Sequence, residues 1–228
     1  TADLVNAGRA VREDETKLCA SINRVPVPFT IGQSAIALFV HPENTFVSAV
    51  SLTETRTIFT ATLWSDVNPL WPQEPIVRLL PRADSDEVAA FARLLFDGDR
   101  DPFLQAPNTT AFDTDSELVQ ALADSPNAVG FAKHPLLLQE GDEFMQALPI
   151  AGQLPDEANV LAGDYPLVYP LYLYSDAGIL QGKPQVAAFL NFYLNHVNEE
   201  IRALGYFPAD GTALDAARTQ YQAILAEK

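Results

Sequence analysis

The sequence is short of basic residues. Its 228 residues include 14 Lys and Arg against 30 Asp and Glu, a formal net charge of −16. Proteins that bind nucleic acid or anionic membrane surfaces need basic patches to neutralise phosphates, so this balance argues against both classes. It would also repel a free anion at long range, so any anion site must depend on local geometry. The simpler interpretation is that the acidity serves solubility.

Cysteine and long apolar runs are also scarce. Cys19 is the single cysteine, which excludes an intrachain disulfide. It falls on the Leu18–Ile22 side of an expected short helix, where we predict a small buried hydrophobic residue. No run approaches the roughly 18 apolar residues of a membrane-spanning helix, so no direct membrane span is expected. The opening residues, Thr1–Val5, read as a strand already under way, so the chain is expected to start inside a domain.

Motifs of catalysis and metal binding are absent from the sequence. It contains no G-x-S-x-G, H-E-x-x-H or phosphate-loop motif, and its Ser, His and Asp residues form no recognisable triad. His41, His134 and His196 lie far apart without metal-ligand spacing, so they are interpreted as surface residues. We therefore expect a protein that is not an enzyme and that has no metal or other cofactor.

Alternating strand and helix patterns predict an α/β fold. Strands are expected at residues 3–6, 25–30, 35–40, 76–80, 128–132 and 167–174. Helices are expected at residues 13–22, 51–61, 88–95, 116–124, 183–204 and 211–227. Ser51 and Glu54 form a capping box, Asp115 or Ser116 should cap the helix that ends at Asp124, and Gly205 should stop the helix at 183–204. That helix carries apolar residues at helical spacing: Val186, Phe189, Leu190, Tyr193, Val197, Ile201 and Leu204. Residues 64–75 and 97–114 should be irregular, and residues 133–164 should alternate short strands with turns around one helical turn at 156–161. Trp64 and Trp71 could form an exposed platform, but packing of their loop onto the domain is favoured.

The turn after the strand at 76–80 is the most informative feature. Such strand-to-helix turns aim backbone N–H groups at one point, where an anion can sit. Here the positions that would meet the anion are Asp86 and Glu87. One interpretation is helix capping by Asp84 or Ser85 with acids in the first turn. The other is that a carboxylate mimics the anion and occupies the site permanently.

Several segments, in order along the chain, resemble the phosphate-binding proteins that serve ABC transporters. Tyr165–Tyr174, for example, reads Y-P-L-V-Y-P-L-Y-L-Y. The other matching segments are Asp3–Arg9, Val40–Val47, Ser51–Val67, Pro126–Phe131, Phe189–Phe192 and Leu204–Pro208. Each motif alone is weak, but together they cover nearly the whole chain.

The resemblance implies a two-lobed periplasmic-binding-protein fold of type 2, with the ligand in the cleft and hinge motion between lobes. Lobe one would be residues 1–42 plus 165–228, and lobe two residues 43–164. The family's N-terminal strand and Ser/Thr-rich loop, one wall of the phosphate site, have no match here, so either they lie upstream of this sequence or lobe one is incomplete at its N-terminus. An incomplete lobe would leave sheet edges uncovered, which a partner chain could fill.

The same resemblance implies ligand-binding roles for Gly8, Arg9, Arg82, Asp84, Ser85 and Asp86. Asp86 stands where the family has Gly, and Glu87 where it has Thr. Two unit charges about 4 Å apart repel by about 4 kcal/mol at an effective dielectric near 20, so conventional phosphate binding is in doubt. Arg9 could bind a carboxylate or phosphate, or form a salt bridge with Asp86, Glu87 or another acid of the opposite lobe.

Two functions follow from these expectations. The first is an extracytoplasmic solute-binding protein, periplasmic or at the cell surface, with lipid anchoring through upstream residues as one possibility. Its partners would be a small anion, such as phosphate or a carboxylate, and an ABC transporter permease. Its altered anion site would set it apart from phosphate binders. The alternative is a ligand-free interaction module that keeps the fold and holds a protein partner through its acidic surface or an uncovered sheet edge.

Overall fold

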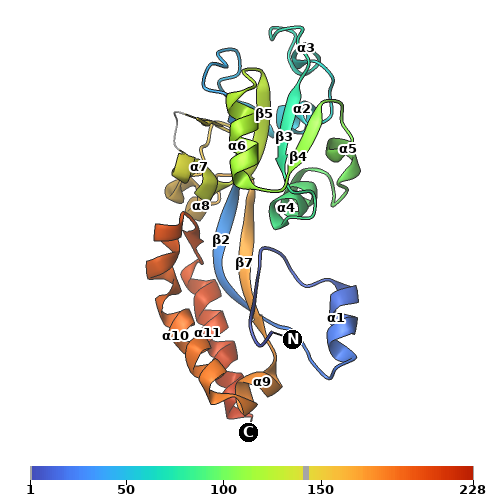
Figure 1. The fold of residues 1–228 in the computed structure, drawn as a ribbon. Coiled ribbons are helices and arrows are strands. Elements are labelled where there is room, and N and C mark those ends of the chain that lie inside the picture. Colours follow the sequence, from blue (N-terminus) through green and yellow to red (C-terminus); the bar gives the residue numbers. More distant parts are fainter. Residues whose placement is uncertain (1, 141–143, 228) are drawn as a thin grey trace. The chain divides into compact units, whose positions relative to one another are not determined.

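The computed structural model describes residues 2–140 and 144–227, and the chain divides into two compact units (Figure 1). Unit 1 comprises Thr1–Ser34 and Tyr169–Lys228, and unit 2 comprises Ala35–Val168. The chain passes between them inside strand β2 (Val27–Val40) and at the start of strand β7 (Val168–Ser175). The ligand-binding lobes expected at 1–42 plus 165–228 and 43–164 stay a prediction.

Unit 1 is a small antiparallel sheet covered by helices. Strand β1 (Val5–Ala7) pairs with β7, and the first half of β2 pairs with β8 (Phe207–Pro208). The helices are α1 (Glu13–Ala20), α9 (Ala177–Gly182), α10 (Pro184–Glu200), the 3-10 turn η1 (Ile201–Leu204) and α11 (Gly211–Ala226). α10 and α11 lie side by side along β2 and β7 (Figure 1). Their packing forms a core that includes Phe29, Ile31, Leu173, Leu190, Leu194 and Tyr221.

The long helix α10 ends as predicted, and its buried face agrees with the predicted one in part, at Leu190, Val197 and, in η1, Ile201. η1 continues it to Leu204, and Gly205 follows in the left-handed conformation at φ 78°, which glycine adopts without strain. The buried stripe consists of Ala187, Leu190, Leu194 and Val197. Phe189 and Leu204, which the helical spacing placed on the buried face, are exposed, so that part of the prediction is wrong.

Unit 2 is built on a mixed sheet in the order β6-β2-β5-β3-β4. β3 (Val77–Pro81) pairs in parallel with β4 (Thr109–Phe112) and β5 (Ala128–Lys133), whereas β2 is antiparallel to β5 and β6 (Gln146–Leu148). The helices are α2 (Leu52–Ile58), α3 (Trp64–Val67), α4 (Asp86–Leu95), α5 (Asp101–Leu104), α6 (Asp115–Ala123), α7 (His134–Glu140) and α8 (Glu157–Ala162). This mixed arrangement confirms the predicted α/β class.

Close packing fixes α4 against this sheet. The ring of Phe91 from α4 stacks on Phe131 of β5, with centroids 4.0 Å apart and planes 16° from parallel. The neighbouring Gly130 must lack a side chain, because an added Cβ would lie 2.4 Å from the Leu79 carbonyl oxygen. The N-terminus of α4 is therefore held in a defined position relative to β3 and β5.

Short elements were missed where the sequence is rich in turn residues. Residues 64–75 contain α3, residues 97–114 contain α5 and β4, and residues 133–164 contain α7. β4 is short and forms by pairing with β3, a contact that no local pattern reveals. The two runs expected at 25–30 and 35–40 are one continuous strand, β2. α9 was also missed, and Thr114, not Asp115 or Ser116, caps α6 by accepting from the Glu117 N–H at 3.3 Å.

Single-residue predictions had mixed outcomes. Trp64 is fully buried and meets Trp71 edge to face, with ring centroids 5.7 Å apart, so the packing interpretation is confirmed. His134, predicted at the surface, is buried at the start of α7. Cys19, predicted to be buried, is only partly buried, and no residue of its helix α1 is buried. The capping box of Ser51 and Glu54 is confirmed, although its helix ends at Ile58.

Arg78 is a fully buried cation whose hydrogen-bond acceptors are carbonyl oxygens. Its Nε donates to Ile58 O at 2.7 Å and its Nη1 to Pro107 O at 2.7 Å, while Nη2 donates to Ala61 O. Burial lowers the pKa of the guanidinium to about 10. The side chain thereby ties the end of α2 and the loop before β4 to β3.

Replacing Arg78 with Met should destabilise unit 2 by about 2–4 kcal/mol, because buried carbonyls would lose their donors. Urea unfolding followed by tryptophan fluorescence measures this, since Trp64 and Trp71 both lie in unit 2. The control is Arg93→Met at an exposed position of α4, expected within about 0.5 kcal/mol of the wild type. Equal effects of the two substitutions would contradict the proposed role of the Arg78 hydrogen bonds.

Candidate functional site

The turn between β3 and α4 is organised by Ser85. The Ser85 hydroxyl accepts from the Val88 N–H at 3.2 Å, and its own N–H donates to the Arg82 carbonyl at 2.9 Å. Ser85 is therefore the N-cap of α4, which confirms the capping interpretation and selects Ser85 over Asp84. Asp86 and Glu87 occupy the first helical turn and are both half-buried. Their charges lie where the helix dipole favours a negative group.

The basic side chain of this turn, that of Arg82, also has a partner. Arg82 Nε donates to the carboxylate of Asp84, and both side chains are largely exposed. The Ala83 carbonyl accepts from Arg100 Nη1 at 3.0 Å. Exposed ion pairs contribute little to stability, so an incoming anion could displace Asp84 at small cost. The turn nevertheless presents more negative than positive side chains.

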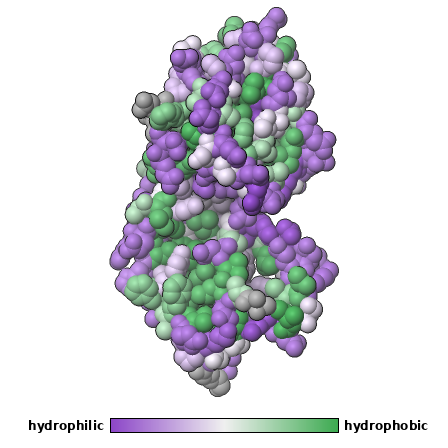
Figure 2. Space-filling view, in the orientation of Figure 1, coloured by the Kyte–Doolittle hydropathy of each residue, from purple (hydrophilic) through white to green (hydrophobic). Residues whose placement is uncertain are grey.

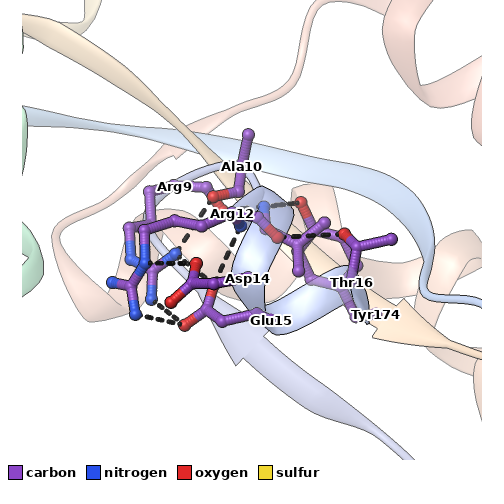
Figure 3. Close-up of polar contacts among 8 residues, drawn as sticks. Arg9, Ala10, Arg12, Asp14, Glu15, Thr16 and Tyr174 are labelled. Carbon is purple, nitrogen blue, oxygen red and sulfur yellow. Dashed lines mark hydrogen bonds and ion pairs between the residues drawn. The ribbon is translucent and has the colours of Figure 1, made fainter. Parts of the chain in front are cut away.

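In unit 1, Arg9 forms a bidentate ion pair with Glu15 of α1 (Figure 3). Nη1 lies 2.8 Å from Oε2, and Nη2 lies 2.7 Å from Oε1. Glu15 Oε2 also accepts from the Arg12 backbone N–H at 2.8 Å. Hydrogen bonds from Arg9, followed by that from Arg12, lower the pKa of Glu15 to about 2. Glu15 follows Arg9 by six residues at the start of α1, a local signal that sequence reasoning missed.

Tyr174 anchors the backbone beside this ion pair. Its hydroxyl accepts from the Val11 N–H at 3.0 Å and donates to the Arg9 carbonyl at 3.5 Å. Burial raises the pKa of this phenol, so the hydroxyl stays neutral at physiological pH. Gly8, next to Arg9, is buried. The segment that carries Gly8 and Arg9 is thus fixed by β7 on one side and by α1 on the other.

The predicted site residues fall into two local groups. Gly8 and Arg9 are neighbours in unit 1, whereas Arg82, Asp84, Ser85 and Asp86 form one turn in unit 2. In each group an arginine is engaged by a nearby carboxylate, Glu15 or Asp84. An anionic ligand at either arginine would compete with that carboxylate. The ligand-binding roles of all six residues stay a prediction.

No cluster of three or more His, Cys, Asp or Glu residues that could hold a metal ion occurs in residues 2–140 and 144–227. Over the same residues, no helix combines the length and the apolar character required to cross a membrane.

Comparison with protein families gives a match over most of the chain. A family model described as "PBP superfamily domain" matches residues 1–196. Among curated proteins, SphX of Synechococcus elongatus is 25% identical over 96% of this chain and 67% of its own length. The phosphate-binding protein PstS of Staphylococcus saprophyticus is 24% identical over 90% of this chain and 65% of its own length. This chain therefore spans about two thirds of these relatives.

Solved structures share the fold. A possible phosphate-binding protein from Planctomyces limnophilus superposes with a TM-score of 0.72 at 24% identity, over 98% of this chain and 81% of that one. A putative phosphate ABC transporter substrate-binding protein from Clostridium perfringens, solved with bound phosphate, gives 0.73 at 18% identity, over 92% and 80%. These likenesses confirm the predicted type-2 periplasmic-binding-protein fold and the resemblance to phosphate-binding proteins.

Replacing Arg9 with Met should move the titration midpoint of Glu15 from about 2 toward its ordinary value near 4.5. Because the folded pKa is depressed, the pair stabilises unit 1 above about 4.5, and this contribution is lost as the pH falls toward about 2. Carboxyl carbon NMR of Glu15 measures the midpoint. Lys17→Met, which removes the partner of Glu13 on the same helix, is the control that should leave it in place. An unchanged midpoint in Arg9→Met would refute the assigned cause.

Proposed function

This chain belongs to the PBP superfamily domain family, and we propose that it is an extracytoplasmic solute-binding protein with an altered anion site. The names of its relatives support the first part: PstS is a phosphate-binding protein, and one solved structure of this fold holds phosphate. The family is one of solute-binding proteins, so the proposed role is binding rather than catalysis. An ABC transporter permease would receive the bound solute.

The turn before α4 carries the proposal of an altered site. Asp86 and Glu87 occupy the first turn of this helix, where the resemblance expects Gly and Thr. Gly would let a phosphate approach the backbone, and Thr would donate a hydroxyl hydrogen bond. Two carboxylates instead add repulsion of about 4 kcal/mol for each unit charge about 4 Å from the ligand, at an effective dielectric near 20. This repulsion outweighs one ordinary hydrogen bond, worth about 1 kcal/mol.

The carboxylates that already pair with the two arginines favour a ligand of low negative charge. Arg9 and Arg82 each already contact a carboxylate, so a bound anion must displace Glu15 or Asp84, or share an arginine with it. A monocarboxylate suffers about half the repulsion that a phosphate dianion does at the same distance, because Coulomb energy scales with charge. We therefore propose a small carboxylate as the ligand and phosphate as a poor one.

A second function is favoured by a separate observation. Among the described residues β1 pairs with β7 alone, so one side of this strand has no partner strand. An interaction module that keeps the fold and holds a polypeptide would use such an edge. Ligand binding and edge pairing involve different residues, so they can be tested separately.

The double substitution Asp86→Gly with Glu87→Thr should raise the affinity for phosphate at least about tenfold, which corresponds to about 1.4 kcal/mol. Removing the two carboxylates lowers repulsion and restores close approach to the backbone. Isothermal titration calorimetry at pH 7.5 with inorganic phosphate measures the change, and thermal shift with a panel of monocarboxylates screens the wild type. A carboxylate at a hundredfold excess over its dissociation constant should stabilise the protein by about 2.7 kcal/mol.

The matched control is Asp97→Gly with Glu74→Thr, which removes the same two side-chain types from exposed positions of unit 2. It should leave phosphate binding unchanged. An equal gain in the control would mean that only the overall charge matters. Tight phosphate binding by the wild type would overturn the altered site. Absence of stabilisation by any anion, in wild type and variant alike, would favour the interaction module.

A further inference from the structure

Helix α10 exposes a row of aromatic rings on the side that faces away from its own core. Phe189 is 50% exposed and Phe192 62% exposed, and His196 is exposed one turn further along. The centroids of the Phe192 and His196 rings lie 4.4 Å apart, and those of Phe189 and the half-buried Tyr193 lie 6.0 Å apart. Spacings of three and four residues place these four rings in one stripe along the helix. On the side of unit 1 that carries α10 and α11, Figure 2 shows hydrophobic residues at the surface.

The same helix has no Asp, Glu, Lys or Arg from residue 184 to residue 198, although 19% of the chain is charged. A helix face that meets only water in so acidic a protein is expected to carry charges, as α1 does with Glu13 and Lys17. Depletion of charged residues together with enrichment in aromatic ones distinguishes the core of a protein interface from the rest of a surface. The outer face of α10 therefore has the composition of an interface core.

The polar and charged residues of this helix are arranged symmetrically about the stripe. Gln185 lies seven residues, two helical turns, before Phe192, and Glu199 lies seven residues after it. Lys183 precedes the helix as its N-cap, and Glu200 ends it. A two-fold axis through Phe192 therefore sets Gln185 of one copy beside Glu199 of another, and Lys183 near Glu200. The outer face of α10 is complementary to itself when two copies run antiparallel.

We propose that the protein forms a weak homodimer in which the outer faces of two α10 helices pack antiparallel across a two-fold axis. The two Phe192 rings meet at the centre, and Phe189 of each copy packs against His196 of the other. Antiparallel packing also sets the negative end of one helix dipole beside the positive end of the other. A parallel pair would instead bring Glu199 and Glu200 against the same residues of the second copy. The dimer uses no residue of the candidate anion site and does not rest on anion binding.

The charge pattern favours a second copy over other occupants. Each copy carries a net charge of −16, but charges more than about 8 Å apart are largely screened at about 0.15 M salt, and the buried face carries none of them. Lys183 contacts Asp3 in its own copy, yet 43% of its side chain is exposed and can meet a further carboxylate. A lipid surface has no counterpart to this pattern, and an anionic membrane repels the acidic chain. A second copy matches both the apolar stripe and its charged ends.

Sedimentation velocity tests the proposal. α10 has 17 residues and is therefore about 26 Å long, so a contact between two such helices is smaller than the about 1,600 Å² of a standard interface. We expect a dissociation constant in the micromolar range, about 10–100 µM. Runs from about 1 to about 500 µM protein in about 0.15 M NaCl should show a monomer that converts into a dimer. A protein that stays monomeric throughout would overturn the proposal, and its flotation with phosphatidylcholine vesicles would then assign the face to a lipid surface.

Substitution of Phe192 localises the contact. Phe192→Glu should raise the dissociation constant at least about tenfold, because it places a charge at the centre of the contact. Leu70→Glu adds the same charge at an exposed apolar position of unit 2 and should change the constant less than about twofold. Circular dichroism checks that both variants fold. A dimer that persists in Phe192→Glu, or equal weakening by both substitutions, would overturn the proposal, because α10 would not be the contact.

Substitution of Gln185 tests the antiparallel orientation. Gln185→Lys should strengthen the dimer about threefold, because the new ammonium meets Glu199 of the other copy at both ends, and Gln185→Glu should weaken it by a similar factor. Leu70→Lys and Leu70→Glu control for the change in overall charge. In a parallel dimer Gln185 lies beside its own counterpart, so both substitutions would weaken it. Weakening by both, or no effect from either, would overturn the proposed arrangement.

Discussion

A helix leaves the N–H groups of its first turn without intrahelical partners, and the side chains around this turn of α4 decide how those groups are satisfied. At α4 the chain supplies both an acceptor, the Ser85 hydroxyl, and negative charge, the Asp86 and Glu87 carboxylates. The packing of Phe91 on Phe131 holds this arrangement in place. A fold shared with phosphate-binding proteins thus carries, at this turn, two carboxylates and a hydroxyl that serves as the helix cap.

The arginines likewise find their hydrogen-bond partners within the protein. Arg9 binds Glu15 through two hydrogen bonds, Arg82 binds Asp84, and the buried Arg78 donates to backbone carbonyls. The two ion pairs differ in geometry and in exposure to solvent. The Arg9–Glu15 pair is bidentate and only about 30% exposed on the glutamate, whereas the Arg82–Asp84 pair is largely in solvent. An incoming carboxylate would therefore displace Asp84 from Arg82 more easily than Glu15 from Arg9.

Local signals predicted the elements that depend on local chemistry. The Ser51–Glu54 capping box and the left-handed Gly205 both act within a few residues, and both were read correctly from the sequence. β4 and the burial of His134 depend on packing partners far along the chain, so no nearby pattern could reveal them. The candidate turn at Arg82–Glu87 was identified from its strand-to-helix pattern. Glu15 was not, because the resemblance placed the expected acidic partners of Arg9 in the opposite lobe.

The apolar residues on and beside α1 are a second place where the prediction of burial was wrong. Leu18 and Ile22 were taken as the side of a helix that carries a buried Cys19, and the structure leaves both exposed. Leaving apolar surface exposed costs about 25 cal/mol per Å² relative to burying it. The exposed side chains of Leu18 and Ile22 therefore do not gain the free energy that a core position would give them. Among the described residues, the backbone groups on the outer side of β1 also have no partner strand, so this edge and the surface of α1 both lack the neighbours that usually cover such features.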